Sequence, residues 1–189
     1  MAIQKRPASP RQKMINLMYV VLMAMLALNV STDVLKGFTL VGNSLDRTIH
    51  TTEQENKDLL DDLAAQYRKN PAKVKPWWDK AQTVQHSADS LCRYIDELKW
   101  AIARETDGAD GNPNSIQHKD DLEAAGVVML NPATLRGRVL YRRVNHFRDF
   151  VTSFITDRRR RAIVAANLST DVPKGEDNID KNWQEYMFE

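Results

Sequence analysis

The stretch MINLMYVVLMAMLALNV, residues 14–30, determines how the rest of this 189-residue chain is interpreted. It carries no charged side chain, and Asn16 and Asn29 are its only strongly polar residues. A helix of this length is about 25 Å long, which approaches the hydrocarbon thickness of about 30 Å of a bilayer. We therefore expect one transmembrane helix, which extends over residues 14–33.

Two other interpretations of this run stay open. Four cations between residues 5 and 13 resemble the positive region of a cleaved signal peptide. However, residues 24–27 (AMLA) do not place small residues at both positions of a cleavage site. A buried core helix would need a large protein around a surface that is hydrophobic on every side. An uncleaved span needs neither a cleavage site nor a large surrounding protein, and it is the preferred interpretation.

The charges on either side of the span predict its orientation. Four cations and no acid precede the apolar run of residues 14–30, whereas Asp33, at the expected membrane interface, and then Asp46 and Glu53 follow this run. Lys and Arg are enriched on the cytoplasmic side of membrane helices. Residues 1–13 are therefore expected in the cytoplasm and residues 34–189 outside it, which in a bacterium means the periplasm.

The composition favours helices and excludes some classes of function. Charged residues make up 28% of the chain and aromatic residues only 7%, a helical rather than a β-rich profile. A net charge of +2 gives no electrostatic case for a nucleic-acid partner. Because Cys92 is the only cysteine, an intrachain disulfide is excluded. We expect a packed free thiol, with an intermolecular bridge as the alternative that no other feature supports.

An apolar stripe continues the helical period beyond the span. Its members are Val34, Phe38, Val41, Leu45 and Ile49, and it resumes between residues 59 and 67. Asn70-Pro71 then interrupts the pattern, because proline cannot continue the hydrogen-bond ladder. The simplest prediction is one very long helix, or two helices in line, from about Arg11 to Lys69.

The clearest signal outside the span is a heptad seam. It consists of Trp77, Ala81, Val84, Ala88, Leu91, Ile95, Leu98 and Ile102. Pro76 is expected to precede this second helix, and the turn-rich stretch TDGADGNP at residues 106–113 to follow it. A coiled coil and a helical bundle are both compatible with the pattern.

Further helices are expected in the C-terminal half. Asn131-Pro132 predicts the start of a third long helix that runs to about Asn167, after a short helix somewhere in residues 114–131. Its seam is Leu140, Val144, Phe147, Val151 and Phe154. A fourth helix is expected from residues 178–180, with Trp183 and Met187 one turn apart. Arg158 to Arg161 are interpreted as a solvated face near a helix C-terminus.

These elements predict an all-α protein, in which a single N-terminal transmembrane helix precedes a periplasmic up-down helical bundle. The expected divisions are a cytoplasmic N-terminus at 1–13, the span at 14–33 and the bundle at 34–189. Because the chain stops within an amphipathic pattern, we expect the natural protein to continue beyond Glu189.

No catalytic motif is present in the sequence. His50, His86, His118 and His146 are far apart and match no metal-ligand spacing. Residues 107–112 resemble a calcium loop only superficially, because Ala109 stands where a ligand is needed. There is no phosphate loop, nucleophile elbow or dinucleotide fingerprint. We expect no enzymatic activity, no metal and no cofactor.

The span carries a polar stripe of its own. On an ideal helix Arg11 and Asn29 share one meridian, and Asn16 and Tyr19 lie beside it. Polar groups in membrane helices usually face protein or water, so these four residues are candidates for a partner interface. Arg11 as a simple topology charge, Tyr19 as a packed aromatic and asparagines paired between two copies remain alternatives.

The apolar run of residues 14–30 contains no acid that could carry a proton across the membrane. If the chain belongs to a proton-driven machine, the carboxylate must therefore come from another protein. Arg11 could stabilise that carboxylate as a counter-charge, but an arginine stays protonated and cannot carry the proton itself.

The sequence PRQKMINLMYVVLMAMLALNVSTDVLKGF, residues 10–38, closely resembles the N-terminus of the GldM and PorM family of gliding-motility and type IX secretion proteins. The motifs PRQKMINLMY and MLALNVS carry the resemblance, which extends more loosely to NWQEYMF, residues 182–188. Family members are much longer and have β-rich periplasmic domains after a helical first domain.

The resemblance implies a homodimer that sits inside a pentamer of a two-span membrane protein of the GldL or PorL type. Proton-motive force is thought to turn one against the other, and the periplasmic part passes the motion to outer-membrane components. By motif position, Arg11 corresponds to a family arginine proposed to meet a membrane glutamate of the partner. Tyr19 corresponds to a second interface position.

The resulting hypothesis is an inner-membrane motor subunit, driven by proton-motive force, that transmits motion to the periplasm for type IX secretion and gliding. A membrane-anchored periplasmic sensor is the alternative, although no second apolar run supplies its usual return across the membrane. A plain structural tether is a third interpretation.

Overall fold

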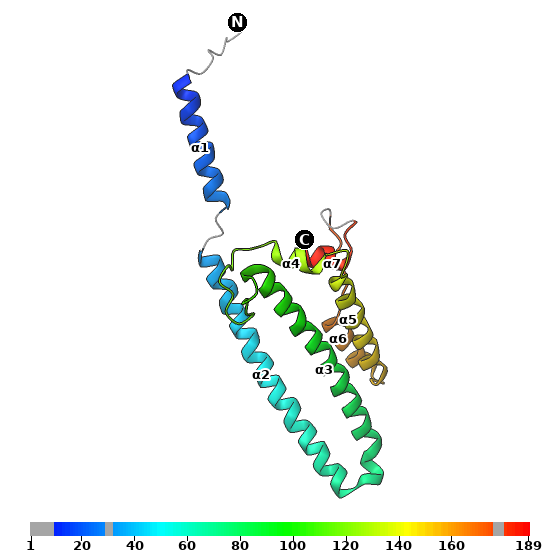
Figure 1. Cartoon of the computed structure of the whole chain (residues 1–189). Helices are drawn as coiled ribbons and strands as arrows, with labels where there is room; N and C mark the ends of the chain where they lie inside the picture. The colour runs from blue at the N-terminus through cyan, green and yellow to red at the C-terminus, as the bar shows by residue number, and fades with distance from the viewer. Residues whose placement is uncertain (1–9, 29–31, 176–179) are drawn as a thin grey trace. The chain divides into compact units, whose positions relative to one another are not determined.

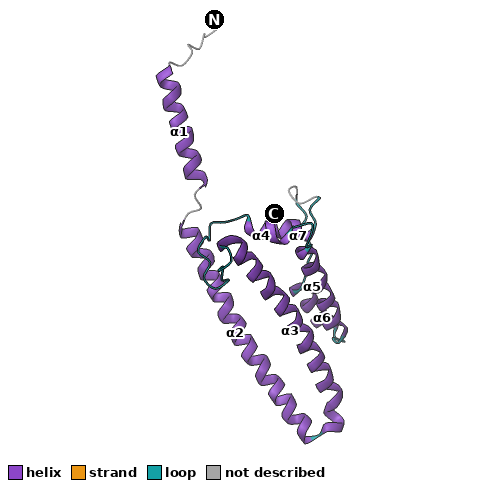
Figure 2. Cartoon of the chain, viewed as in Figure 1, coloured by secondary structure: helices purple, strands orange, loops and turns teal. Residues whose placement is uncertain are grey.

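The computed structural model describes residues 10–28, 32–175 and 180–189, and within these ranges every regular element is helical. The helices are α1 (Pro10–Leu28), α2 (Thr32–Lys69), α3 (Pro71–Asp107), α4 (Ala124–Met129), α5 (Arg136–Ser153), α6 (Arg158–Asn167) and α7 (Trp183–Phe188) (Figures 1 and 2). The predicted all-α class is confirmed for this part of the chain. Contacts divide the chain into two compact units, Met1–His50 and Thr51–Glu189.

The first unit contains α1 and the start of α2. Residues 14–28 of the predicted span lie in α1, which begins at Pro10. Residues 29–31 lie outside the described residues. Of the helices that the structure describes, none is both long and apolar enough to cross a membrane.

The hairpin between α2 and α3 follows from a local signal. The predicted break at Asn70-Pro71 is confirmed, since α2 ends at Lys69 and α3 begins at Pro71. The Asn70 side chain accepts a hydrogen bond of 3.3 Å from the backbone N–H of Lys73 and so caps α3. Tyr67 and Trp78 stack across the turn, with ring centroids 5.8 Å apart.

The prediction that Pro76 precedes the second helix is wrong, because Pro76 lies inside α3. A proline in this position removes one backbone hydrogen bond. The Asn70 cap and a proline in the first helical position, Pro71, still favour the earlier start.

The second unit has its small core where the C-terminal half of α3 meets α4, α5 and α7. Leu98, Val128 and Met129 are buried there, and the partly buried residues packed against them are Tyr94, Ala101, Ile102, Leu140 and Phe188. The heptad seam of α3 is therefore covered unevenly. Leu98 near its end is buried, whereas Trp77 at its beginning is exposed.

The predicted third helix is two helices in the structure. It does not begin at Asn131, whose Oδ1 instead accepts a hydrogen bond of 2.9 Å from the N–H of Ala133 in a turn. Leu135, with a φ of 51°, redirects the chain into α5. The chain leaves α5 after Ser153 and restarts at α6, where the carboxylate of Asp157 accepts the N–H of Arg160 at 2.7 Å.

Two further expectations need correction. Arg158 to Arg161 are exposed as predicted, but they open α6 instead of closing a helix, because the Asp157 cap starts a new element before them. Cys92 is an exposed thiol, not a packed one, since it lies outside the covered face of α3. Trp183 and Met187 lie one turn apart in α7, as predicted, and Phe188 packs against the core.

The start of α7 is fixed by a capping box at Asn182. Its side chain accepts the N–H of Glu185 at 3.1 Å, and the Glu185 carboxylate accepts the N–H of Asn182 at 2.9 Å. The helix therefore begins at Trp183. The predicted start at residues 178–180 falls partly on residues 178 and 179, which lie outside the described residues.

Asp107 ties the loop after α3 to the helix end. Its carboxylate accepts the backbone N–H groups of Gln117 at 2.8 Å and His118 at 3.0 Å, and the Nδ1 atom of His118 lies 2.9 Å from it. The hydrogen bond from Gln117 is the main cause of a pKa below the usual 3.8, outweighing the opposing effect of desolvation. It is therefore the charged form of the Asp107 carboxylate that holds the loop.

The sign of this pKa shift predicts acid sensitivity. A lowered pKa stabilises the fold above about pH 4, and the contribution is lost as the pH falls through the native pKa. We expect Asp107→Asn to melt at a lower temperature than the unsubstituted chain at pH 7. The difference between the two melting temperatures should disappear below about pH 4. Thermal melts across this range test it. Asp110→Asn removes a carboxylate of the same loop that accepts no hydrogen bond from another described residue, so it should melt at the temperature of the unsubstituted chain at pH 7. A difference in melting temperature for Asp107→Asn that stays constant across the pH range would contradict the assignment.

Candidate partner interface

The predicted interface residues that the structure describes share one half of α1. At about 100° per residue, Tyr19 lies about 80° and Asn16 about 140° around the helix from Arg11. All three side chains are exposed. The Oδ1 atom of Asn16 accepts a hydrogen bond of 3.1 Å from Gln12, which fixes the asparagine along the helix surface. Asn29 lies outside the described residues.

The apolar surface of α1 is uncovered within the described structure. Met14, Leu17, Met18, Val20 and Met23 point in different directions around the helix, and each is at least 64% exposed. An apolar surface of this extent is a sign of contact with a partner or with lipid. The helix therefore presents both an apolar surface and the polar group of Arg11, Asn16 and Tyr19 to its surroundings.

The predicted stripe on α2 is equally open. Val34, Phe38, Val41, Leu45 and Ile49 are each at least half exposed. They lie on one face of a single helix, because α2 runs without interruption from Thr32 to Lys69. The helical period predicted from the sequence is thus confirmed, and the stripe is a second uncovered apolar surface that follows α1 in the chain.

Sequence reasoning missed a group of basic residues between α3 and α5. His86 and His146, which are distant in the sequence, line the same groove together with Arg142 and Arg143. The only signal in the sequence is the density of arginine in α5, where five arginines accompany one acid, Asp149. This density does not reveal which helix lies opposite. No cluster of three or more potential metal ligands occurs among the described residues.

A family model decides where the chain belongs. The model described as the GldM N-terminal domain matches residues 33–189, which is most of the chain. The chain belongs to the GldM family. Membership implies involvement in the gliding and type IX secretion machinery, as a structural or motor component and not as a known enzyme. No curated protein matches the chain.

The GldM match covers α2 from its second residue, together with α3 to α7, and it begins where the predicted span ends. Arg11, Asn16 and Tyr19 precede the matched range. Their assignment to an interface therefore depends on the motif PRQKMINLMY and on the exposure of α1.

Proposed function

We propose that this GldM-family chain is an inner-membrane motor subunit that converts proton-motive force into movement of its periplasmic part. In this proposal residues 14–33 cross the membrane once, residues 1–13 are cytoplasmic and residues 34–189 are periplasmic. The observation that carries it is the GldM match over residues 33–189, which begins three residues after the end of the uncharged run of residues 14–30. The uncovered apolar surface of α1 supports the same placement.

The proposed partner is a GldL- or PorL-type protein with two spans, whose pentamer supplies a membrane glutamate. Arg11 offers that glutamate a guanidinium, which can bind a carboxylate through two parallel hydrogen bonds. When the glutamate is charged the pair is favourable, and when it takes up a proton the attraction falls. Arg11 thereby senses the charge of the glutamate, while Asn16, Tyr19 and Asn29 contribute the polar side of the contact.

Transmission to the periplasm is assigned to α2. Its 38 residues correspond to a length of about 57 Å. The exposed stripe from Val34 to Ile49 is suited to pairing with the same stripe of a second copy, because burying both stripes removes apolar surface from water. A homodimer of this kind would carry the motion to periplasmic and outer-membrane secretion components.

The proposal predicts a complete functional loss in the Arg11→Ala variant. Removing the guanidinium leaves the partner's carboxylate without its counter-charge, so we expect secretion and gliding to stop while the complex with the two-span protein still copurifies. The measurements are secretion and gliding assays in cells that produce the variant at the native level. Arg11→Lys keeps the charge but loses the paired hydrogen bonds, so partial activity is expected.

Two controls separate this role from simpler ones. Lys13→Ala removes a cation from the same end of α1 and should leave activity intact if Arg11 acts through a specific contact. Exchange of residues 14–33 for an unrelated apolar span should abolish activity in a motor but not in a tether. Full activity of Arg11→Ala would disprove the assigned role.

A further inference from the structure

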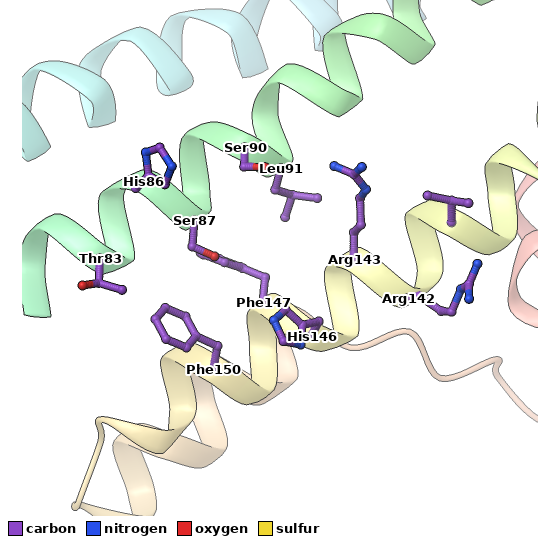
Figure 3. A pocket seen from close by; sticks show the side chains of 11 residues that line it. Thr83, His86, Ser87, Ser90, Leu91, Arg142, Arg143, His146, Phe147 and Phe150 are labelled. Carbon is purple, nitrogen blue, oxygen red and sulfur yellow. The ribbon is translucent and has the colours of Figure 1, made fainter.

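A groove with a cavity volume of about 620 Å³ lies between α3 and α5, within the range typical of ligand sites. Figure 3 shows Arg143, Phe147 and Phe150 projecting from α5 towards α3, with Thr83, Ser87 and Leu91 on the facing helix. The lining residues fall into two groups. The half-buried ones form a floor: Ser87, Leu91, Val139, Phe147 and Phe150. The exposed ones form a rim: Thr83, His86, Ser90, Arg142, Arg143 and His146.

The floor is apolar and is held in place by its neighbours. Apart from the hydroxyl of Ser87, it consists of aliphatic and aromatic side chains. The ring of Phe150 packs edge-on against that of Phe154, with centroids 4.9 Å apart and an interplanar angle of 87°. Such a contact limits the rotamers open to Phe150. A ligand for this floor must therefore have an apolar part.

The rim is basic and carries no acid among the described residues that line the groove. The side chains of Arg142, His86 and His146 form no ion pair or hydrogen bond with another described residue. The guanidinium of Arg143 lies 4.2 Å above the ring of Tyr94. Burial raises the pKa of Tyr94, so its phenol stays neutral and supplies Arg143 with no counter-charge. The rim therefore favours an anionic group.

The length of the groove indicates the size of this ligand. The lining residues extend over about 12 Å of α3, from Thr83 to Leu91, and about 16 Å of α5, from Val139 to Phe150. An extended peptide advances about 3.3 Å per residue, so roughly four residues fill the groove. Arginine side chains match carboxylates in geometry, and the hydroxyls of Ser87 and Ser90 can bond to a peptide backbone.

We propose that the groove between α3 and α5 binds a short acidic peptide segment in which carboxylate and apolar side chains alternate. In an extended chain these side chains face opposite ways, so one set can enter the apolar floor while the other reaches the basic rim. The partner is therefore a protein with an exposed acidic segment, and this site is separate from the interface on α1.

The experiment measures binding of the synthetic peptide acetyl-Leu-Glu-Leu-Glu-amide to the full chain in a nonionic detergent, by isothermal titration calorimetry. We expect a dissociation constant below about 1 mM. The double variant Arg142→Gln/His146→Gln should weaken binding by at least about tenfold, because the charge-assisted contact of Arg142 and the imidazole contact of His146 are both lost. Both side chains are exposed, so the variant should keep its fold, which circular dichroism can verify.

Matched controls make the result specific to the groove. Arg93→Gln removes a charge from α3 outside the groove lining and should leave binding unchanged. The peptides acetyl-Leu-Gln-Leu-Gln-amide and acetyl-Gly-Glu-Gly-Glu-amide, which lack the charge or the apolar groups, should each bind at least about tenfold more weakly. Equal binding of the acidic and the glutamine peptide, or equal losses in the double variant and in Arg93→Gln, would overturn the proposal.

A second copy of the chain is the other occupant that the test can reveal. In that case the peptide would not bind, and Arg142→Gln/His146→Gln would change the sedimentation coefficient of the chain. This combination would also overturn the proposal. Unchanged sedimentation together with weakened peptide binding supports it.

Discussion

Gly111→Ala should destabilise the second unit by about 3 kcal/mol, the upper part of the usual range for overpacking. A Cβ atom in this position would overlap the carbonyl oxygen of Ala103 and lie 2.9 Å from the backbone nitrogen of Arg104. Both atoms belong to α3 and cannot move without breaking helical hydrogen bonds. Ala103 is itself fully buried. The loop would have to leave the helix, and chemical denaturation monitored by circular dichroism measures the loss.

Gly42→Ala is the matched control for this substitution. Gly42 lies inside α2, and an added Cβ meets nothing within 4 Å. Alanine in a helix interior is favoured over glycine by about 0.5–1 kcal/mol, so this variant should be as stable as the unsubstituted chain or more so. A Gly111→Ala variant that unfolds at the same denaturant concentration as Gly42→Ala would show that the close approach of loop and helix is wrong.

Leu98→Ala should lower the free energy of unfolding by about 3 kcal/mol, within the range measured for buried leucines. Leu98 is 5% exposed and lies in the core cluster with Val128 and Met129. Because so few side chains are buried in the described structure, the core has few other contacts with which to compensate. The transition midpoint in urea and its slope measure the effect.

Leu59→Ala removes the same atoms from an exposed position. Leu59 lies on α2 and is 67% exposed, so its substitution should change stability by less than about 0.5 kcal/mol. A comparable loss in both variants would mean that Leu59 is covered in solution. Such a result would point to a self-associated chain and would weaken the assignment of the core to the α3, α4, α5 and α7 contact.

Local signals account for the parts of the fold that were predicted correctly. Asn70-Pro71 combines a side chain that caps a helix with a residue that cannot continue one. It therefore separates α2 from α3 whatever the rest of the chain packs against. The stripe from Val34 to Ile49 has a helical period and lies on one helix in the structure. Both features depend on residues within a few turns of each other, which a sequence displays directly.

The errors occurred where local signals competed. The third helix was expected as one element because apolar residues recur at a helical spacing up to Phe154. In the structure the chain leaves the helix there, Asp157 caps a new one, and the guanidinium of Arg161 donates hydrogen bonds of 2.9 and 2.6 Å to the carbonyl of Ile155. Periodicity alone does not distinguish a continuous helix from two that share the same spacing.

The interface on α1 could be predicted from the sequence, whereas the groove between α3 and α5 could not. Asn16 and Tyr19 could be selected from the sequence, because polar groups within an apolar run are conspicuous in any arrangement, and Arg11 because it lies one helical turn before that run. The groove between α3 and α5 could not, since His86 and Arg142 come together only when those two helices pack.

By itself, the sequence determined the helical class, the hairpin at Asn70-Pro71 and the apolar run at residues 14–30, since each depends on neighbours along the chain. The tertiary structure alone decided that Leu98 is covered while Trp77 is not, and that two histidines and two arginines line one groove. A helical period marks the face that can be buried, but burial depends on which distant segment arrives to cover it.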